Sequence, residues 1–424
     1  MKSHVRSREE NCIIVMLATC SFKWIFEGRF SFSFLEAALL AVGLLQIVKR
    51  YVRINFGVGL WVLAVAYIWM SMLINGTTAG NIIKAAVFSL TVMYLVFADY
   101  SKININTVSD FIEKIGLFYA VFVFLHFILK ENFNALYFPL LSPYNQIYAY
   151  AYYRGGRYFG LQYSPHELAG LLVFSIMLVV FRMITNNKIR IKELALLGVF
   201  LLALILTGKR GILAIGAVAI VAMVLIFYHS QKKWLNNIKI LSAICLLGAI
   251  FIFLMNIFPD SSIFYRINKM FDSFSRGVFL DKERRALYKL AIDTWKQNPV
   301  FGIGWRNFTF LTIDNPQFAL GHQVNCDYLQ WLCELGTVGF GICISAVIIN
   351  LKNGIWLCGN LNRINNDTKK KSALFGIAIQ FFIIMYAFIE VPFYNILFFG
   401  FYILSCIIIN GICRELKVKG TLNE

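Results

Sequence analysis

The chain has 424 residues, of which 59% are hydrophobic and only 15% are charged. Soluble domains contain about 45–50% apolar and about 25% charged residues, so this composition excludes an ordinary soluble domain and indicates an integral membrane protein. The net charge is +18. The lysines and arginines gather between apolar segments, which favours lipid head groups, membrane orientation and anionic substrates over nucleic acid.

Twelve apolar segments approach the length of about 20 residues that a membrane-spanning helix needs. They lie near 11–26, 31–48, 57–75, 80–98, 111–129, 166–183, 193–207, 211–228, 238–257, 328–350, 373–391 and 395–413. A helix satisfies its own backbone hydrogen bonds in lipid, and these segments are too long and too uniformly apolar for barrel strands. The prediction is an all-α, polytopic membrane protein with a long extracytoplasmic loop that contains amphipathic helices.

The positions of lysine and arginine predict which side of the membrane each connection occupies. Connections rich in these residues alternate along the chain with poorly charged ones around 27–30, 76–79 and 392–394. Basic connections stay in the cytoplasm, so both termini are expected there. The long segments 130–165 and 258–328 then fall on the extracytoplasmic side.

The short turn Thr207-Gly-Lys-Arg210 also falls on the extracytoplasmic side, where Lys209 and Arg210 are exceptions to the charge rule. One explanation is that both cations reach back to lipid head groups. The other is a cation directed into a cavity that binds an anion, because charged groups at this depth are costly and tend to be functional.

A helix start is predicted at the end of segment 130–165. Ser164 fits the N-cap and Pro165 the first turn, which places His166 and Glu167 at the outer interface, where Glu167 complements the helix dipole. Seven tyrosines precede this start; an interfacial aromatic belt explains most of them, and sugar stacking is a second use. They are Tyr137, Tyr144, Tyr148, Tyr150, Tyr152, Tyr153 and Tyr158.

The segment 258–328 contains a predicted amphipathic helix that starts near Asp281 and ends at Asn298-Pro299. Residues on its apolar face recur at helical spacing. They are Leu287, Leu290, Ala291 and Trp295. The Gly302-Ile-Gly304 that follows has no preceding strand and no third glycine, so it indicates a tight turn or a flap, not a dinucleotide site.

His322 is the only histidine of segment 258–328. A neutral imidazole is suited to accept a proton near neutral pH. If the chain is helical here, His322, Asn325 and Leu329 share one face that points into the mouth of the tenth span.

Three short motifs lie in order on the extracytoplasmic side. They are Thr207-Gly-Lys-Arg210-Gly211; Arg284-x-x-Leu-Tyr288 with Asn298-Pro-Val-Phe-Gly302-Ile-Gly304; and Tyr328-Leu-Gln330 with Glu334-Leu-Gly336-x-x-Gly339. In order and spacing they resemble the bacterial O-antigen ligase and O-antigen polymerase superfamily over residues 157–339. The start of this region is similar to the family's Gly-x-x-x-x-Pro-Asn helix start, with His166 where Asn is usual.

This resemblance implies an inverting, metal-independent glycosyltransferase without a cofactor, in the bacterial inner membrane and with its active site at the periplasmic face. The implied donor is a glycan on undecaprenyl diphosphate. The implied acceptor is another lipid-linked glycan or lipid A-core. Membrane lipids and a chain-length regulator are further implied partners, and nucleic acid is not.

The resemblance also implies roles for individual residues. The family's arginines hold the diphosphate leaving group, which suits a guanidinium because its fork binds phosphate oxygens in pairs and stays charged. This catalytic role falls to Arg210 and Arg284, and that of general base to His322. The predicted substrate-binding residues are Lys209, Arg157, Arg285, Asn325 and Arg306.

The histidine departs from the family pattern in one respect. It usually lies three residues before Tyr-Leu-Gln, which is the position of Asn325 here, whereas His322 lies a turn earlier. Either His322 reaches the same point from the next turn, or Asp327 or Glu334 is the base.

The predicted function is polymerisation of lipid-linked oligosaccharide repeat units for O-antigen or capsular polysaccharide. Ligation of the glycan to lipid A-core is the alternative. A flippase of lipid-linked glycan ranks lower, because few charges lie in the spans and the halves of the chain differ. The predicted regions are 1–165 (N-terminal transmembrane region), 166–350 (ligase-like core with the extracytoplasmic loop 258–328) and 351–424 (C-terminal transmembrane helices).

Overall fold

The computed structural model describes residues 7–28, 33–48, 52, 54–186, 190–232, 282–313, 318 and 321–421. The helices in these ranges are α1 (Arg8–Ser21), α2 (Lys23–Phe26), α3 (Ser33–Leu45), α4 (Phe56–Asn75), α5 (Ala79–Phe97), α6 (Ile105–Leu129), α7 (Glu131–Tyr137), α8 (Pro143–Arg154), α9 (Pro165–Thr185), α10 (Ile191–Leu206), α11 (Arg210–Ser230), α14 (Lys282–Gln297), α15 (Phe308–Ile313), α16 (Asp327–Gly359), α17 (Asp367–Tyr386) and α18 (Ile396–Thr421). Short 3-10 helices are η1 (Tyr100–Lys102), η2 (Phe138–Leu140), η3 (Leu361–Arg363) and η4 (Pro392–Tyr394). The described residues form no strand beyond one isolated bridge, which confirms the all-α prediction for this part of the chain.

The predicted apolar segments coincide with helices wherever the structure describes them. The ninth, near 238–257, lies outside the described residues. Among the described helices, seven are long and apolar enough to cross a membrane, so the polytopic membrane fold is confirmed while the number of twelve spans stays a prediction. The eleventh segment was placed too far along the chain, because α17 ends at Tyr386 and η4 forms before α18 begins.

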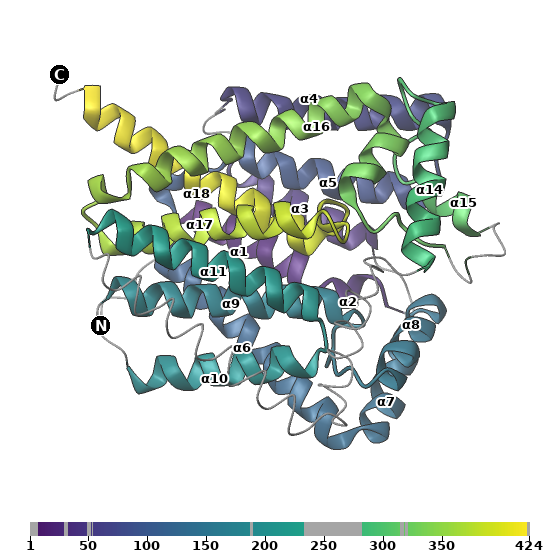
Figure 1. Ribbon diagram of the computed structural model, residues 1–424, viewed down its shortest axis with the longest axis horizontal. Helices are drawn as coiled ribbons and strands as arrows, with labels where there is room; N and C mark the ends of the chain where they lie inside the picture. The colour runs from purple at the N-terminus through teal and green to yellow at the C-terminus, as the bar shows by residue number, and fades with distance from the viewer. Residues whose placement is uncertain are drawn as a thin grey trace.

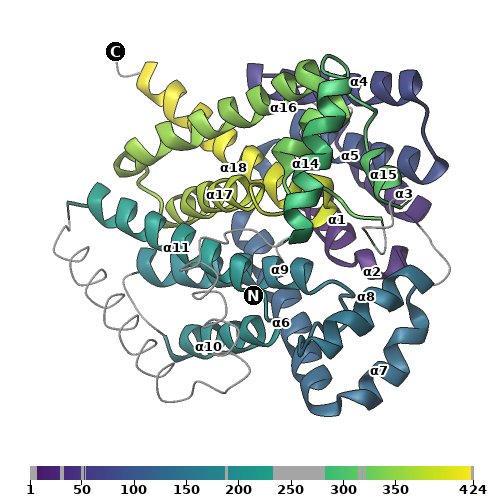
Figure 2. The same cartoon turned by 45° about the vertical axis from the view of Figure 1, so that its right-hand side comes forward.

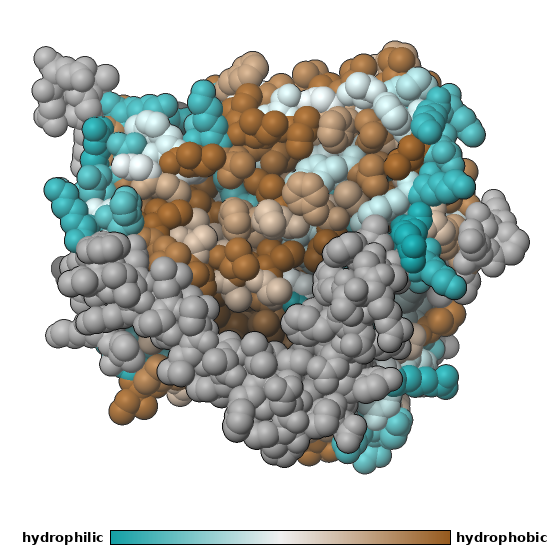
Figure 3. Space-filling view, viewed as in Figure 1, coloured by the Kyte–Doolittle hydropathy of each residue, from teal (hydrophilic) through white to brown (hydrophobic). Residues whose placement is uncertain are grey.

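The long helices lie side by side along the longest axis of the molecule (Figure 1). The strongest pairings join α4 to α16, α17 to α18, α9 to α10, α11 to α17, and α3 to α5. The visible surface is apolar across the middle and hydrophilic at both ends of this axis (Figure 3). Large apolar side chains also stay exposed on the outer helices, including Val121, Leu202, Val218 and Ile348. This distribution fits a bundle whose middle faces lipid.

Helices α7, α8, α14 and α15 lie together at one end of the bundle, and α18 ends at the other (Figures 1 and 2). The start of α1 is also at the far end, because the Ser7 hydroxyl donates to the Lys102 carbonyl at 2.7 Å and α18 packs on η1. The predicted amphipathic helix is α14, with Leu287 and Ala291 buried. The helices α7 and α8 were not predicted.

A glycine junction fixes the loop after α14 against α16. The backbone of Gly336 has a φ of 66° inside α16, and Gly302 has a φ of 68°. A Cβ on Gly336 would lie 2.2 Å from the Val300 carbonyl oxygen. The N–H of Ile303 donates to the Cys333 carbonyl at 3.1 Å. The Gly-x-Gly segment is therefore a tight turn held against the break in α16.

The segment before α16 is not helical, so the shared helical face of His322, Asn325 and Leu329 was wrong. Asn325 has a φ of 59° and Cys326 is extended with a φ of −161°. The helix therefore begins only at Asp327. The side-chain oxygen of Gln330 also accepts the N–H of Val324 at 3.2 Å, which folds the preceding segment back onto the helix.

An aromatic core holds the connection between α17 and α18. Trp61 lies 5.5 Å from Phe399, and Phe88 stacks on Phe399 at 4.2 Å. Phe393 of η4 packs on Trp331 with ring centroids 4.9 Å apart. This packing positions the residues that flank η4 at the end of the bundle that carries α14.

Candidate active site

The turn between α10 and α11 presents Lys209 at the end of the bundle that carries α8 and α14. Gly208 has a φ of 66°, a conformation that glycine adopts without strain. The Thr207 hydroxyl donates to the Leu204 carbonyl at 2.7 Å, and the Tyr158 N–H donates to the Leu206 carbonyl at 3.0 Å. The turn is thereby fixed to the segment that precedes α9.

Two cations converge on the Tyr152 ring of α8. The Lys209 Nζ lies 5.0 Å and the Arg157 guanidinium carbon 5.4 Å from the ring centre. The Lys209 amine also contacts Nε2 of His166 in the first turn of α9. Burial, together with the positive charge of Arg157, lowers the pKa of Lys209 to about 7, although the carboxylate of Glu390 opposes this shift.

Glu390 connects these residues to α14. Its Oε1 accepts from Nη2 of Arg284 at 3.2 Å and lies 3.7 Å from Nδ1 of His166. Arg284 also donates through Nη1 to the Ile389 carbonyl at 3.0 Å. The same His166 nitrogen lies 3.1 Å from the Tyr386 hydroxyl. A continuous set of polar contacts therefore runs from the 207–209 turn to α14.

We call Arg157, Lys209, Arg284, His166 and Glu390 the cation cluster. It contains two arginines, one lysine, one histidine and one carboxylate, drawn from five separate segments of the chain. Such a concentration of positive charge in a partly buried place is suited to bind an anion with several oxygens.

Arg210 and Arg285 differ in their relation to the cation cluster. Arg210 begins α11, and a Cβ on the next residue, Gly211, would lie 3.0 Å from the Ile389 side chain. Arg210 is therefore placed beside the residue whose carbonyl accepts Arg284. Arg285 is exposed on α14.

His322 lies next to the cation cluster along α14. Its Nε2 is 3.5 Å from the carboxylate of Glu283, the neighbour of Arg284. Its N–H donates to the Thr312 hydroxyl at 2.7 Å, and that hydroxyl lies 3.0 Å from its carbonyl. The backbone of His322 is thus fixed, while 24% of its side chain is exposed.

Asn325 and the two carboxylates after it hold the start of α16. The Tyr288 hydroxyl donates to the Asn325 carbonyl at 3.2 Å. Asp327 accepts the Phe393 N–H at 2.9 Å. Glu334 accepts the backbone N–H of Arg306 at 2.8 Å. Both carboxylates are fully buried. Backbone donors occupy both oxygens of Glu334, an arrangement that stabilises structure, whereas Oδ1 of Asp327 has no hydrogen-bond partner among the described residues.

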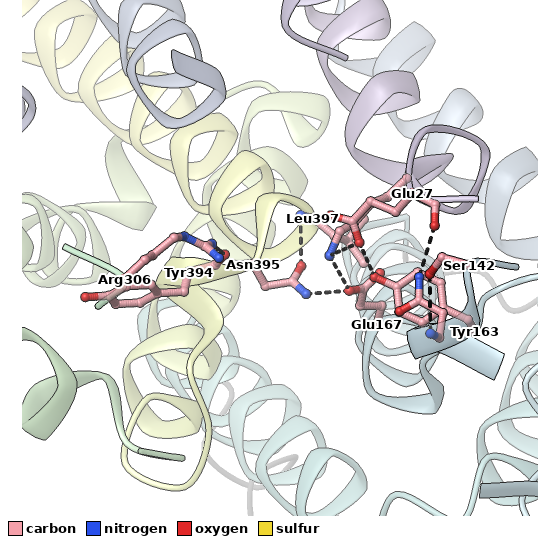
Figure 4. A network of polar contacts seen from close by, with 10 residues as sticks. Glu27, Ser142, Tyr163, Glu167, Arg306, Tyr394, Asn395 and Leu397 are labelled. Carbon is pink, nitrogen blue, oxygen red and sulfur yellow. Dashed lines mark hydrogen bonds and ion pairs between the residues drawn. The ribbon is translucent and has the colours of Figure 1, made fainter. Parts of the chain in front are cut away.

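Arg306 belongs to a separate network (Figure 4). Its guanidinium donates to the Tyr394 carbonyl and lies 5.4 Å from the Tyr394 ring centre. The next residue, Asn395, donates to Glu167 at 2.6 Å, and Lys23 donates to the same oxygen at 3.0 Å. This network ties α2, α9 and α18 together beside the cation cluster.

Glu167 lies in the first turn of α9, as predicted, and its carboxylate also accepts from the side chains of Lys23 and Asn395. The predicted helix start is confirmed, since α9 begins at Pro165, yet the Ser164 side chain makes no capping hydrogen bond. Pro165 at the first helical position lacks an N–H, which leaves one fewer unpaired donor at the start of the helix.

The structure brings Arg157, Lys209 and Arg284 together, and it places Arg210 and His322 beside them. The sequence interpretation missed the positions of His166 and Glu390 in this cluster. An isolated carboxylate in an apolar stretch was the one available signal for Glu390. Its partners lie 106 and 224 residues away along the chain, which no local pattern reveals.

Residues 194–344 match the protein-family model described as O-antigen ligase. The matched region contains Lys209, Arg210, Arg284 and His322, whereas His166 and Glu390 lie outside it. No curated protein matches the chain in sequence. The apolar helices identify an integral membrane protein, and the match supports the predicted resemblance to the O-antigen ligase and O-antigen polymerase superfamily, with an O-antigen ligase domain over residues 194–344.

Proposed function

We propose that the chain polymerises oligosaccharide repeat units that are carried on undecaprenyl diphosphate, in the synthesis of O-antigen or capsular polysaccharide. The observation that carries this proposal is the convergence of Lys209, Arg157 and Arg284 on one partly buried place. A diphosphate is the leaving group of such a donor, and it needs positive charge where its own charge develops. The family match supports the reaction class.

The proposed reaction is an inverting, metal-independent glycosyl transfer. A hydroxyl oxygen of the acceptor glycan forms a bond to the anomeric carbon of the donor sugar. The bond between that carbon and the phosphate oxygen breaks, and undecaprenyl diphosphate leaves with the bonding electrons. The hydroxyl proton passes to a base, for which His322 remains the proposed residue, held 3.5 Å from Glu283.

The cation cluster also suggests what Glu390 does before the donor binds. Its carboxylate lies 3.2 Å from Arg284 and balances part of the positive charge. A diphosphate would compete with this carboxylate for the guanidinium, because both are acceptors of its fork. We assign Arg284 and Arg210 to the leaving group, with Lys209 and Arg157 at its other side.

The proposed location is the bacterial inner membrane, with both termini in the cytoplasm and the cation cluster at the periplasmic face. The grouping of α8, α14 and the cluster at one end of the bundle, away from the start of α1 and the end of α18, supports this orientation. It also keeps the cluster on the side where the sequence placed both long segments.

Ligation of the lipid-linked glycan to lipid A-core is a second candidate, and the description of the matching family as O-antigen ligase favours it. Both candidates use the same donor and the same leaving group. They differ in the acceptor, which is another lipid-linked glycan for the polymerase and lipid A-core for the ligase.

A deletion strain complemented at matched expression tests the function. The variants are Arg284→Ala, Arg210→Ala and His322→Ala, and the readouts are the surface polysaccharide ladder and the lipid-linked pool. Core that bears a single repeat unit indicates loss of a polymerase, whereas long polymer left on the lipid with bare core indicates loss of a ligase. A normal ladder from all three variants contradicts the site, and repeat units stranded on the cytoplasmic face indicate a flippase.

A further inference from the structure

Three tyrosines form a row along one face of α8. Tyr144, Tyr148 and Tyr152 recur at four-residue intervals, which places them one above the next on a helix. The ring centroids of the first two are 4.9 Å apart, and those of the second pair are 6.3 Å apart. The row covers about 12 Å along the helix axis, which suits a short oligosaccharide better than a single sugar.

Other tyrosines of α8 are directed elsewhere. Tyr150 packs edge-on against Phe138 with ring centroids 4.7 Å apart. Tyr153 stacks on His126 at 5.5 Å. These contacts join α8 to η2 and α6, so Tyr150 and Tyr153 have structural partners that the row does not share.

The inner end of the row belongs to the cation cluster. Tyr152 is the ring on which Lys209 and Arg157 converge, and its centroid lies 6.2 Å from that of His166. A ligand whose diphosphate occupies the cluster therefore has its first sugar beside Tyr152.

The outer end of the row meets the segment that carries His322. The Tyr144 hydroxyl lies 3.2 Å from the Gly321 carbonyl oxygen and 3.3 Å from the Tyr148 hydroxyl. Tyr144 is 49% exposed. The inner end of the row therefore lies at the proposed leaving-group site. The outer end contacts the backbone beside His322, whose side chain is directed to Glu283.

The aromatic-belt interpretation does not account for this arrangement. Belt tyrosines place their rings at the lipid head groups, whereas this row runs from the cation cluster to the segment that carries His322. The single proton of the Tyr144 hydroxyl is donated to the Gly321 carbonyl, so the Tyr148 hydroxyl, 3.3 Å from that of Tyr144, donates to it and keeps its own oxygen as an acceptor. Tyr148 therefore offers a sugar both an apolar ring and a hydrogen-bond acceptor.

We propose that Tyr144, Tyr148 and Tyr152 bind the glycan of the lipid-linked donor, with the sugar nearest the diphosphate at Tyr152 and the following sugars at Tyr148 and Tyr144. The direction follows from the position of the cation cluster at the inner end. The proposal rests on the proposed function, because that function supplies the diphosphate at the cluster.

Two lipid probes distinguish glycan binding by the tyrosine row from diphosphate binding by the cation cluster. The first is undecaprenyl diphosphate without sugar, and the second is the lipid-linked oligosaccharide that accumulates in the deletion strain. Dissociation constants are measured by thermophoresis for the full chain in lipid nanodiscs. Tyr148→Ala should weaken binding of the glycosylated probe about tenfold and leave the sugar-free probe unchanged, whereas Arg284→Ala should weaken both.

Tyr150→Ala is the matched control on the same helix and should change neither dissociation constant. Tyr148→Phe keeps the ring, and it should lose only the part of the affinity that the hydroxyl contributes. Retention of the sugar-free probe shows that each variant is folded. Glycan binding by the three tyrosines is refuted if Tyr148→Ala binds the glycosylated probe with wild-type affinity, or if it loses affinity equally for both probes. In either case the proposed function stands. Failure of the wild type to bind either probe overturns both.

Discussion

Replacement of Arg284 by alanine removes a cation that has two separable roles. In the unliganded protein its guanidinium donates to Glu390 at 3.2 Å and to the Ile389 carbonyl at 3.0 Å. The pair is partly exposed, with 27% and 18% of the two side chains accessible, so its loss should cost about 1–2 kcal/mol of stability. Much of this cost is the carboxylate left without its partner.

The catalytic loss should be larger than the loss of stability. Hydrogen bonds to charged groups contribute about 1.5–3 kcal/mol each. A guanidinium fork makes two such hydrogen bonds to a diphosphate. Their loss should slow the glycosyl transfer that releases undecaprenyl diphosphate by about 10²- to 10⁴-fold. Arg284→Lys keeps the charge without the fork and should fall between the wild type and alanine.

The double variant Arg284→Ala/Glu390→Ala separates the two roles. It should recover the melting temperature, because no unpaired carboxylate remains, and it should not recover the release of undecaprenyl diphosphate from the lipid-linked glycan in nanodiscs. Arg285→Ala is the control, since that side chain is exposed on the same helix. Recovery of both stability and release in the double variant refutes a catalytic role for Arg284.

Three further predictions concern charge, backbone and packing. Because the Lys209 pKa is about 7 and an anion favours the protonated amine, the affinity for undecaprenyl diphosphate should fall as the pH rises from about 6 to about 8; Lys209→Arg should remove this dependence, and a flat wild-type profile contradicts it. Gly336→Ala should lower the melting temperature strongly, since its Cβ would lie 2.2 Å from a carbonyl oxygen, whereas Gly341→Ala, with open space around it, should not; equal melting temperatures contradict the junction. Glu167→Gln weakens the 3.0 Å contact with Lys23 and should cost about 1–3 kcal/mol, and an unchanged melting temperature in nanodiscs contradicts a stabilising network.

The membrane fold was predictable because hydropathy acts locally. A segment such as 57–75 must be helical in lipid whatever its neighbours are, and α4 occupies Phe56–Asn75. The helix α8 escaped prediction, because its tyrosine, asparagine and alanine residues give neither a long apolar run nor a strong apolar face. The Ser142 side chain caps its first turn, and Tyr150 and Tyr153 pack on aromatic rings of η2 and α6.

The candidate site was predictable in its cations and not in their partners. Lys209 and Arg210 stood out because they broke the charge rule for the outer side. Their neighbours could not be derived, because His166 in α9 and Glu390 in the connection between α17 and η4 come from segments remote in the sequence. The helical face assigned to His322 was wrong for a local reason, the left-handed backbone of Asn325, which residue periodicity does not report.

The most direct measurement uses the purified full chain in nanodiscs with the lipid-linked oligosaccharide from the deletion strain as sole substrate. The length of the lipid-linked glycan and the release of undecaprenyl diphosphate are followed together. Polymerisation at the cation cluster predicts that the glycan grows by whole repeat units, that one lipid diphosphate leaves per bond formed, and that Arg284→Ala abolishes both. Growth and release that continue at the wild-type rate in Arg284→Ala contradict this account.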